Sequence, residues 1–152
     1  MWNDISKIWQ AAFYEGWNSF KNGSIPIGAV IADENDNIIC TGRNRVSEIT
    51  DGNHRIAHAE TDCLLRLDTR KYPDVKNYTI YACMEPCPMC MGALLHCKIG
   101  GIVFGAFDER TGSAGSSLNL CELEFFRKPK IIGGYMEEES KKLLRSFFEE
   151  RR

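Results

Sequence analysis

Apolar residues near the start of the chain recur at steps of three and four, which predicts an amphipathic helix of about five turns. The stripe consists of Ile5, Ile8, Trp9, Ala12, Phe13, Trp17 and Phe20. We expect Gly23 and Pro26 to end this helix, because neither residue continues one. A second stripe predicts a closing helix; it consists of Met136, Leu143, Leu144, Phe147 and Phe148.

Short β-rich runs lie between these two helices. Residues 27–32 form a nearly continuous apolar run, as expected of a strand that is covered on both faces. Residues 33–37 are polar and predict a turn, so residues 38–44 are expected to pair antiparallel with the first run. Further strands are predicted at residues 78–84, 102–105 and 131–132.

Helical spacing predicts a helix over residues 57–67, and Pro86 is expected to open another that runs to about residue 98. A short helix is predicted at residues 121–126, and loops are predicted at residues 47–55 and 108–117. Helices and strands therefore alternate along most of the chain. This order predicts one α/β domain over residues 1–152, with helices on both faces of a mixed sheet.

Composition is that of a globular protein, with 43% hydrophobic and 26% charged residues. No apolar run approaches the ~18 residues that a membrane span needs, and the first residues do not resemble a secretory signal. We therefore expect no membrane association and a cytoplasmic location. The net charge of −2 does not favour broad affinity for phosphate backbones.

Seven cysteines in 152 residues are the unusual feature of the composition. An odd count in a chain large enough for its own core argues against a disulfide framework. It favours a reduced intracellular protein in which thiolates bind a metal or cysteines are buried as free thiols. We expect Cys40, Cys63 and Cys121 to be buried small hydrophobes.

Two short motifs carry candidate chemistry: His58-Ala59-Glu60 and Pro86-Cys87-Pro88-Met89-Cys90. Cysteines at i and i+3 on the first turn of a helix lie nearly on one side, so both sulfurs can reach one cation. The positive end of that helix lowers the pKa of the thiols. With His58 as a neutral third ligand, the set suits one Zn²⁺ per chain.

A count of three protein ligands is typical of a catalytic zinc site, because the fourth position is left for water. The two thiolates cancel the charge of the ion, so the water needs a nearby base. Glu60 is placed at the helix start to take the proton of the water and pass it to a leaving group.

Other interpretations of these residues are weaker. A lone Cys-x-x-Cys also occurs in redox and structural sites, but redox use would leave His58 and Glu60 without a role. Cys83 could complete a closed four-ligand cage only by turning from its strand into the site. We expect His54 and His96 to be ordinary surface or core histidines.

Together the motifs resemble the cytidine and deoxycytidylate deaminase superfamily, whose signature is His-x-Glu followed by Pro-Cys-x-x-Cys. Residues 23–30, 57–60, 85–93 and 104–106 look like the branch that contains tRNA adenosine, guanine and cytosine deaminases. Residues 111–116, with the closing Phe147-Phe148 helix, look most like the tRNA adenosine deaminases.

The resemblance implies a three-layer α-β-α fold with a five-stranded mixed sheet. It implies that His58, Cys87 and Cys90 are the zinc ligands and that Glu60 is the proton shuttle. It places Asn44 and the backbone of Ala59 and Glu85 against the substrate ring. It also implies that Asp108 and Arg110 lie in a loop that contacts polynucleotide in the tRNA enzymes.

The resemblance further implies a homodimer. Large apolar side chains that could serve such a contact are Trp2, Trp9, Trp17, Phe125 and Phe126.

Several residues depart from the tRNA branch. Arg55-Ile56 stand where Pro-Thr is usual, residues 127–130 replace an Asn-His pair, and Glu149-Glu150 lie where basic residues would meet phosphates. From these changes and the net charge, we expect a small nucleobase or nucleoside as substrate, with the tRNA anticodon as the alternative. A rival of another class is a zinc-stabilised binding module without turnover.

Overall fold

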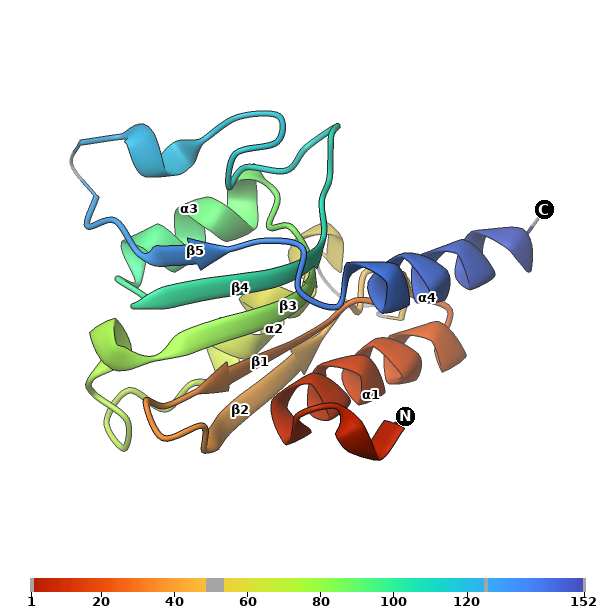
Figure 1. Cartoon of the computed structure of the whole chain (residues 1–152), viewed down its shortest axis with the longest axis horizontal. Coiled ribbons are helices and arrows are strands. Elements are labelled where there is room, and N and C mark those ends of the chain that lie inside the picture. The colour runs from red at the N-terminus through yellow and green to blue at the C-terminus, as the bar shows by residue number, and fades with distance from the viewer. Residues whose placement is uncertain (1, 49–53, 125, 152) are drawn as a thin grey trace.

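The computed structural model describes residues 2–48, 54–124 and 126–151. Its centre is a five-stranded sheet in the order β2-β1-β3-β4-β5 (Figure 1). The strands are β1 (Gly28–Ala32), β2 (Ile38–Arg43), β3 (Thr79–Met84), β4 (Gly101–Ala106) and β5 (Lys130–Ile132). β1 is antiparallel to β2 and β3, whereas β3, β4 and β5 are parallel, so the sheet is mixed.

Helices cover both faces of this sheet (Figure 1). α1 (Lys7–Lys21) and α4 (Glu137–Glu149) lie on one face, and α2 (Ala59–Arg66) and α3 (Pro88–His96) lie on the other. The predicted three-layer fold is therefore confirmed. Among the described residues, no helix is long and apolar enough to span a bilayer.

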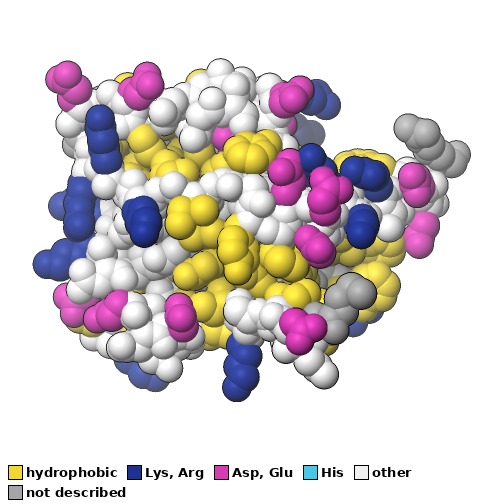
Figure 2. All heavy atoms as spheres, in the orientation of Figure 1, with side chains coloured by type: hydrophobic (Ala, Val, Ile, Leu, Met, Phe, Trp, Pro, Cys, Tyr) yellow, Lys and Arg dark blue, Asp and Glu magenta, His cyan; other side chains and the backbone are white. Residues whose placement is uncertain are grey.

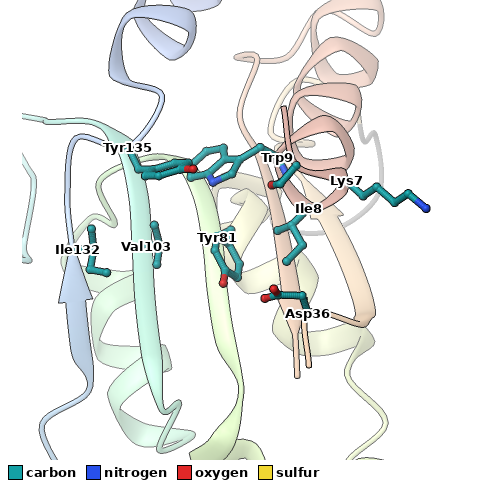
Figure 3. Close-up of a pocket in the computed structure, with 9 residues that line it drawn as sticks. Lys7, Ile8, Trp9, Asp36, Tyr81, Val103, Ile132 and Tyr135 are labelled. Atoms are coloured by element: carbon teal, nitrogen blue, oxygen red, sulfur yellow. The ribbon is translucent and has the colours of Figure 1, made fainter. Parts of the chain in front are cut away.

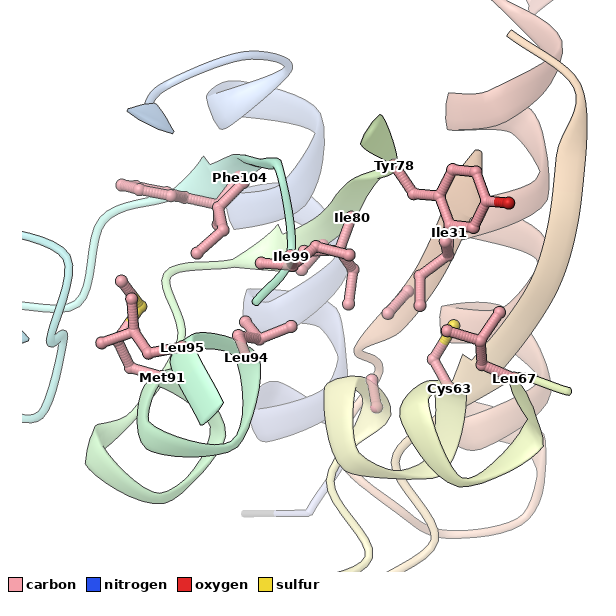
Figure 4. Packing of buried hydrophobic residues seen from close by; sticks show 14 of the residues in the cluster. Ile31, Cys63, Leu67, Tyr78, Ile80, Met91, Leu94, Leu95, Ile99 and Phe104 are labelled. Atoms are coloured by element: carbon pink, nitrogen blue, oxygen red, sulfur yellow. The ribbon is translucent and has the colours of Figure 1, made fainter. Parts of the chain in front are cut away.

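The core follows the two-residue period of the strands. In β1, Ala29 and Ile31 pack toward α2 and α3, whereas Val30 and Ala32 pack toward α1. All five β1 residues are buried, as the continuous apolar run predicts. Figure 4 shows the larger of the two clusters, in which α3 residues such as Leu94 pack beneath Ile80 of β3.

The helix starts differ from the sequence prediction by two residues. α3 begins at Pro88 rather than at Pro86, and Cys87 is an extended N-cap residue. The cause is steric, because the residue before a proline is disfavoured in the helical region. α2 likewise begins at Ala59, with His58 as its N-cap.

Smaller differences lie elsewhere in the chain. The short helix predicted at residues 121–126 is a single 3-10 turn, η4 (Leu120–Glu122). Part of the predicted loop, residues 49–53, and Phe125 lie outside the described residues.

Hydrophobic side chains gather on the sheet face between α1 and β5 (Figure 2). A hollow of about 500 Å³ lies there, and Trp9 stacks on Tyr135 in its wall with ring centroids 5.5 Å apart (Figure 3). Among the described residues that line it, Asp36 is the only acidic one, and none is a histidine or a cysteine. This hollow therefore has no metal-ligating cluster, and the candidate chemistry lies elsewhere.

Candidate active site

Three metal-ligating side chains meet where α2 and α3 begin. His58 is the N-cap of α2, Cys87 is the N-cap of α3, and Cys90 lies in the first turn of α3. Their ligand atoms all lie within 4.8 Å of one another. The Nδ1 atom of His58 is 3.6 Å from the Sγ atom of Cys87.

The sheet topology explains why distant parts of the chain meet here. β3 is antiparallel to β1 and β1 is antiparallel to β2, so the carboxyl ends of β2 and β3 lie at one edge. β4 is parallel to β3, with Met84 opposite Ala106, so its carboxyl end lies there too. The segments that follow these three strands carry Asn44, Cys87 and Asp108.

The donor set fits zinc. Two sulfurs and one imidazole nitrogen are ligands that Zn²⁺ prefers, and tetrahedral Zn–S and Zn–N bonds place sulfur and nitrogen about 3.5 Å apart. The separation of 3.6 Å between His58 and Cys87 is close to that value. Both cysteines also lie at a helix start, where the backbone favours negative charge on sulfur.

Cys87 and Cys90 shift each other's pKa in opposite directions. Hydrogen bonding from Cys90, and then from His58, lowers the pKa of Cys87 to about 4. The same contact with Cys87, together with burial, raises the pKa of Cys90. The hydrogen bond to Cys87 also raises the pKa of His58. The lowered pKa therefore favours a thiolate at Cys87, which suits a divalent cation.

Glu60 lies beside these groups, at the second residue of α2. Its side chain is 4% exposed, and burial raises the pKa of its carboxyl group. The carboxyl also interacts with the Cys90 thiol. A carboxyl group that is held dry next to a metal-ligating cluster can accept a proton and return it.

A cavity of about 320 Å³ opens against the cluster. Its wall includes all the predicted site residues except Cys90, together with apolar side chains from β3, α4 and the segments before β1 and after β2. The residues that line it are Ile25, Ile27, Asn44, Val46, His58, Ala59, Glu60, Met84, Glu85, Cys87, Asp108, Thr111, Leu144 and Phe148.

Asn44 is fixed in this wall from three sides. Its backbone N–H donates to Ile27 at 2.9 Å, and its carbonyl oxygen accepts from the Ser19 hydroxyl at 2.7 Å. The side-chain Oδ1 atom accepts from the Val46 N–H at 3.1 Å. The amide oxygen is therefore used by the protein, which leaves the NH₂ end as the group that can donate to a ligand.

Glu85 has a structural role that sequence reasoning missed. Its buried carboxylate accepts three backbone N–H groups, from Asp108 at 3.0 Å and from Ala114 and Ser116 at 3.1 Å each. Its own N–H donates to Ala106 at 2.8 Å. A Cβ atom at residue 112 would collide with this carboxylate, so the loop needs Gly112. Spacing alone cannot reveal a contact between segments this far apart.

The other candidate residues lie outside the ligand cluster. The Cys83 thiol is directed to the α1 side, where it donates to the Ala12 carbonyl at 3.6 Å, so the closed four-ligand cage does not form. His54 and His96 do not belong to the cluster. Asp108 lines the cavity, but its carboxylate accepts from its own loop, at Arg110 and Thr111. Arg110 does not line the cavity.

Comparison with known families identifies the class of protein that this fold and site define. The model of the cytidine and deoxycytidylate deaminase zinc-binding region matches residues 3–106. The chain belongs to this family of zinc-binding deaminases, and the expectations of a deaminase and of zinc as cofactor are confirmed.

Relatives that match most of the chain are named tRNA-specific adenosine deaminases. The protein of Bacillus subtilis is 35% identical over 147 residues, which are 93% of this chain and 86% of the relative. The tRNA-specific adenosine deaminase 2 of Xenopus laevis is 32% identical over 154 residues, which are 97% of this chain and 87% of the relative.

Solved structures agree with the fold. A structure from work on A-to-I editing by tRNA:A34 deaminases at the wobble position has a TM-score of 0.72 and 25% identity, and covers 84% of this chain and 96% of its own. Guanine deaminase from Nitrosomonas europaea has a TM-score of 0.74 over 92% of this chain and 82% of its own. At 21% identity, this second structure shows a shared fold only.

Replacing Glu85 with alanine is expected to loosen residues 108–116. Three backbone N–H groups would lose a charged acceptor, which lowers the free energy of unfolding by about 3 kcal/mol. Hydrogen exchange should accelerate at Asp108, Ala114 and Ser116, whereas zinc content should stay unchanged. Glu109→Ala, at an exposed residue of the same loop, is the control. Unchanged exchange in the loop of E85A would contradict the assignment.

Proposed function

We propose that this chain is a zinc-dependent hydrolytic deaminase in which His58, Cys87 and Cys90 hold the metal and Glu60 moves the protons. The observation that carries the proposal is the buried Glu60 carboxyl group between the ligand cluster and the cavity. A purely structural zinc site has no use for such a group, since structural sites are closed by four protein ligands. The binding-module interpretation leaves it unexplained.

The expected reaction removes an exocyclic amine from a nucleobase ring. Zinc at this position supplies a Lewis acid that activates a water molecule. A carboxylate oxygen of Glu60 accepts a proton as the water oxygen bonds to the ring carbon, and Glu60 then protonates the adjacent ring nitrogen. Glu60 next accepts the proton of the new hydroxyl group and passes it to the exocyclic amine. The C–N bond then breaks, and ammonia leaves.

Three further residues are proposed to hold the ring. The NH₂ end of Asn44 can donate to a ring acceptor, because the amide oxygen is occupied by Val46. The backbone of Ala59 and the carbonyl of Glu85 lie in the same wall and can meet the ring or its amine. The apolar residues Ile27 and Val46 complete the wall and exclude water from the ring faces.

We propose adenosine in a tRNA anticodon as the substrate. Relatives at 32–35% identity over nearly the whole chain are named tRNA-specific adenosine deaminases. They favour tRNA over the small-molecule substrate that the net charge of −2 suggested. Net charge is an average over the whole surface, and binding depends on the charge near the cavity.

A second hollow beside the cavity supports this choice. It has a volume of about 280 Å³ and shares Met84, Leu144 and Phe148 with the cavity. Phe107 and Phe148 are about half exposed there, and its charged lining residues are Lys141, Arg145 and Glu149. Lys141 pairs with Glu137 at 2.6 Å, whereas Arg145 has no ion pair among the described residues. Aromatic rings and a free guanidinium group are typical of sites that bind single-stranded nucleic acid.

We also propose a homodimer that buries the outer surface of α2 and α3. Leu65 of α2 is 86% exposed, and Ile56 and Met89 nearby in the fold are also exposed. Of the large residues noted in the sequence, Trp9 is buried in the core, whereas Trp2 and Trp17 are exposed. The chain should have the mass of a dimer in light scattering, and Leu65→Glu should shift it to a monomer. A wild-type monomer at micromolar concentration would contradict the proposal.

Glu60→Gln tests the reaction. The amide cannot accept the proton of the water, so ammonia release should fall by a factor of about 100 or more. Zinc content by mass spectrometry and the unfolding midpoint should stay near wild type, whereas Cys87→Ala should lose the metal. Glu109→Gln is the matched control. Full turnover by E60Q would exclude Glu60 as proton shuttle.

The substrate is tested by an ammonia-release assay with an adenosine-34 anticodon stem-loop, free nucleobases and nucleosides at two salt concentrations. We expect turnover of the stem-loop, a fall in its affinity as salt rises, and little activity on the small compounds. Arg145→Ala should raise KM for the stem-loop and reduce the salt dependence, with kcat nearly unchanged. Efficient turnover of a free base with an inert stem-loop would restore the small-molecule hypothesis.

A further inference from the structure

Two cysteines that the deaminase site does not use lie against each other where α2 packs on β2. Cys40 is in the edge strand β2, and Cys63 is in α2. Their sulfur atoms are 3.6 Å apart. Each thiol also approaches the backbone carbonyl of the other residue, at 3.5 and 3.6 Å. Sequence reasoning treated both residues as separate buried thiols.

The contact follows from a close approach of α2 to β2. Cys40 and Gly42 lie on the same face of the strand because side chains alternate along it. A Cβ atom at residue 42 would collide with the backbone of Ala59 and Cys63. Glycine at this position therefore lets the helix backbone rest directly on the strand, which brings the side chain of Cys63 to that of Cys40.

We propose that Cys40 and Cys63 are an oxidisable dithiol pair, which a small disulfide such as oxidised glutathione converts to an intramolecular disulfide joining β2 to α2. A disulfide has an S–S distance of about 2.05 Å, so the two sulfurs need to approach by only about 1.5 Å. Side-chain rotation can supply a shift of this size. The pair is separate from the proposed zinc ligands His58, Cys87 and Cys90.

Exposure and charge give the two thiols different roles. Cys40 is partly exposed, whereas Cys63 is fully buried, so the oxidant meets Cys40 first. The hydrogen bond from Cys63 lowers the pKa of Cys40, and the Arg66 guanidinium group lowers it further. The same hydrogen bond and burial raise the pKa of Cys63. Cys40 is therefore the attacking thiolate and Cys63 the resolving thiol.

The exchange is balanced in two steps. The Cys40 thiolate attacks one sulfur of oxidised glutathione, its S–S bond breaks, and one glutathione thiolate leaves. Cys63 then loses its proton and attacks the Cys40 sulfur, so that the protein disulfide forms and the second glutathione leaves. Two cysteine thiols are oxidised, one glutathione disulfide is reduced, and the two protons pass to the released glutathione thiolates.

The bond would join two elements that both lead into the cavity. β2 ends one residue before Asn44, and α2 begins directly after His58. The disulfide would close a loop that contains residues 41–62, which includes the cavity-wall segments of both elements. Closing a loop of this length reduces the conformational freedom of the unfolded chain.

The experiment uses zinc-loaded, fully reduced protein incubated with oxidised glutathione and digested with trypsin without reduction. Cleavage after Lys21, Arg43, Arg55 and Arg66 places Cys40 and Cys63 alone in separate peptides. We expect these two peptides to appear cross-linked, with one zinc per chain retained and Tm raised by roughly 5–10 °C. Cys63→Ala should show neither the cross-link nor the Tm shift, and should accumulate glutathione on Cys40. Cys97→Ala, which removes an exposed thiol, should behave as wild type.

Two outcomes would overturn the proposal. One is that oxidised glutathione releases zinc and links Cys87 to Cys90 while Cys40 and Cys63 stay reduced. The other is that glutathione remains on Cys40 in the wild-type protein without resolution by Cys63. The readout is the cross-link and not turnover, so a failure of this proposal is distinguishable from a failure of the proposed deamination.

Discussion

The carboxyl ends of β2, β3 and β4 lie at one edge of the sheet, and the arrangement of the site depends on this constraint. A different kind of group follows each strand: the Asn44 amide follows β2, the sulfurs of Cys87 and Cys90 follow β3, and the loop that begins near Asp108 follows β4. The start of α2 adds an imidazole and a carboxyl group at the same edge, on the face that α3 also covers. Neither helix could supply the three ligands alone, so the metal site exists only when the sheet has formed.

Burial explains how acidic groups can share this edge. The carboxyl groups of Glu60 and Glu85 are both almost fully buried and both line the cavity, but their surroundings differ. Glu85 is satisfied by three backbone N–H groups and is committed to structure. Glu60 lies in a low-dielectric environment, and this burial raises the pKa of its carboxyl group, whereas the hydrogen bond with the Cys90 thiol lowers it. Two glutamates of similar burial therefore differ in how far the protein satisfies their carboxyl groups.

Much of the fold was predictable from the sequence, because its signals are local. The period of α1, the continuous apolar run of β1 and the turn before β2 depend on neighbouring residues only, and so does the spacing of Cys87 and Cys90. The start of α3 was predicted two residues early, because the restriction that Pro88 places on Cys87 was not weighed. The carboxylate of Glu85 bound to a distant loop, and the contact of Cys40 with Cys63, depend on tertiary packing. Local patterns contain no information about such contacts.

The hydrogen bonds that residues 108, 114 and 116 donate to Glu85 also determine how the loop beside the cavity is ordered. A flexible lid gains its order when the substrate arrives, and part of the binding free energy is lost in ordering it. Here the loop is tied through a buried carboxylate to the end of β3, so its shape is settled when the chain folds. The shape of the cavity is therefore set before any ligand arrives, so a ligand has to adapt to the protein rather than the reverse.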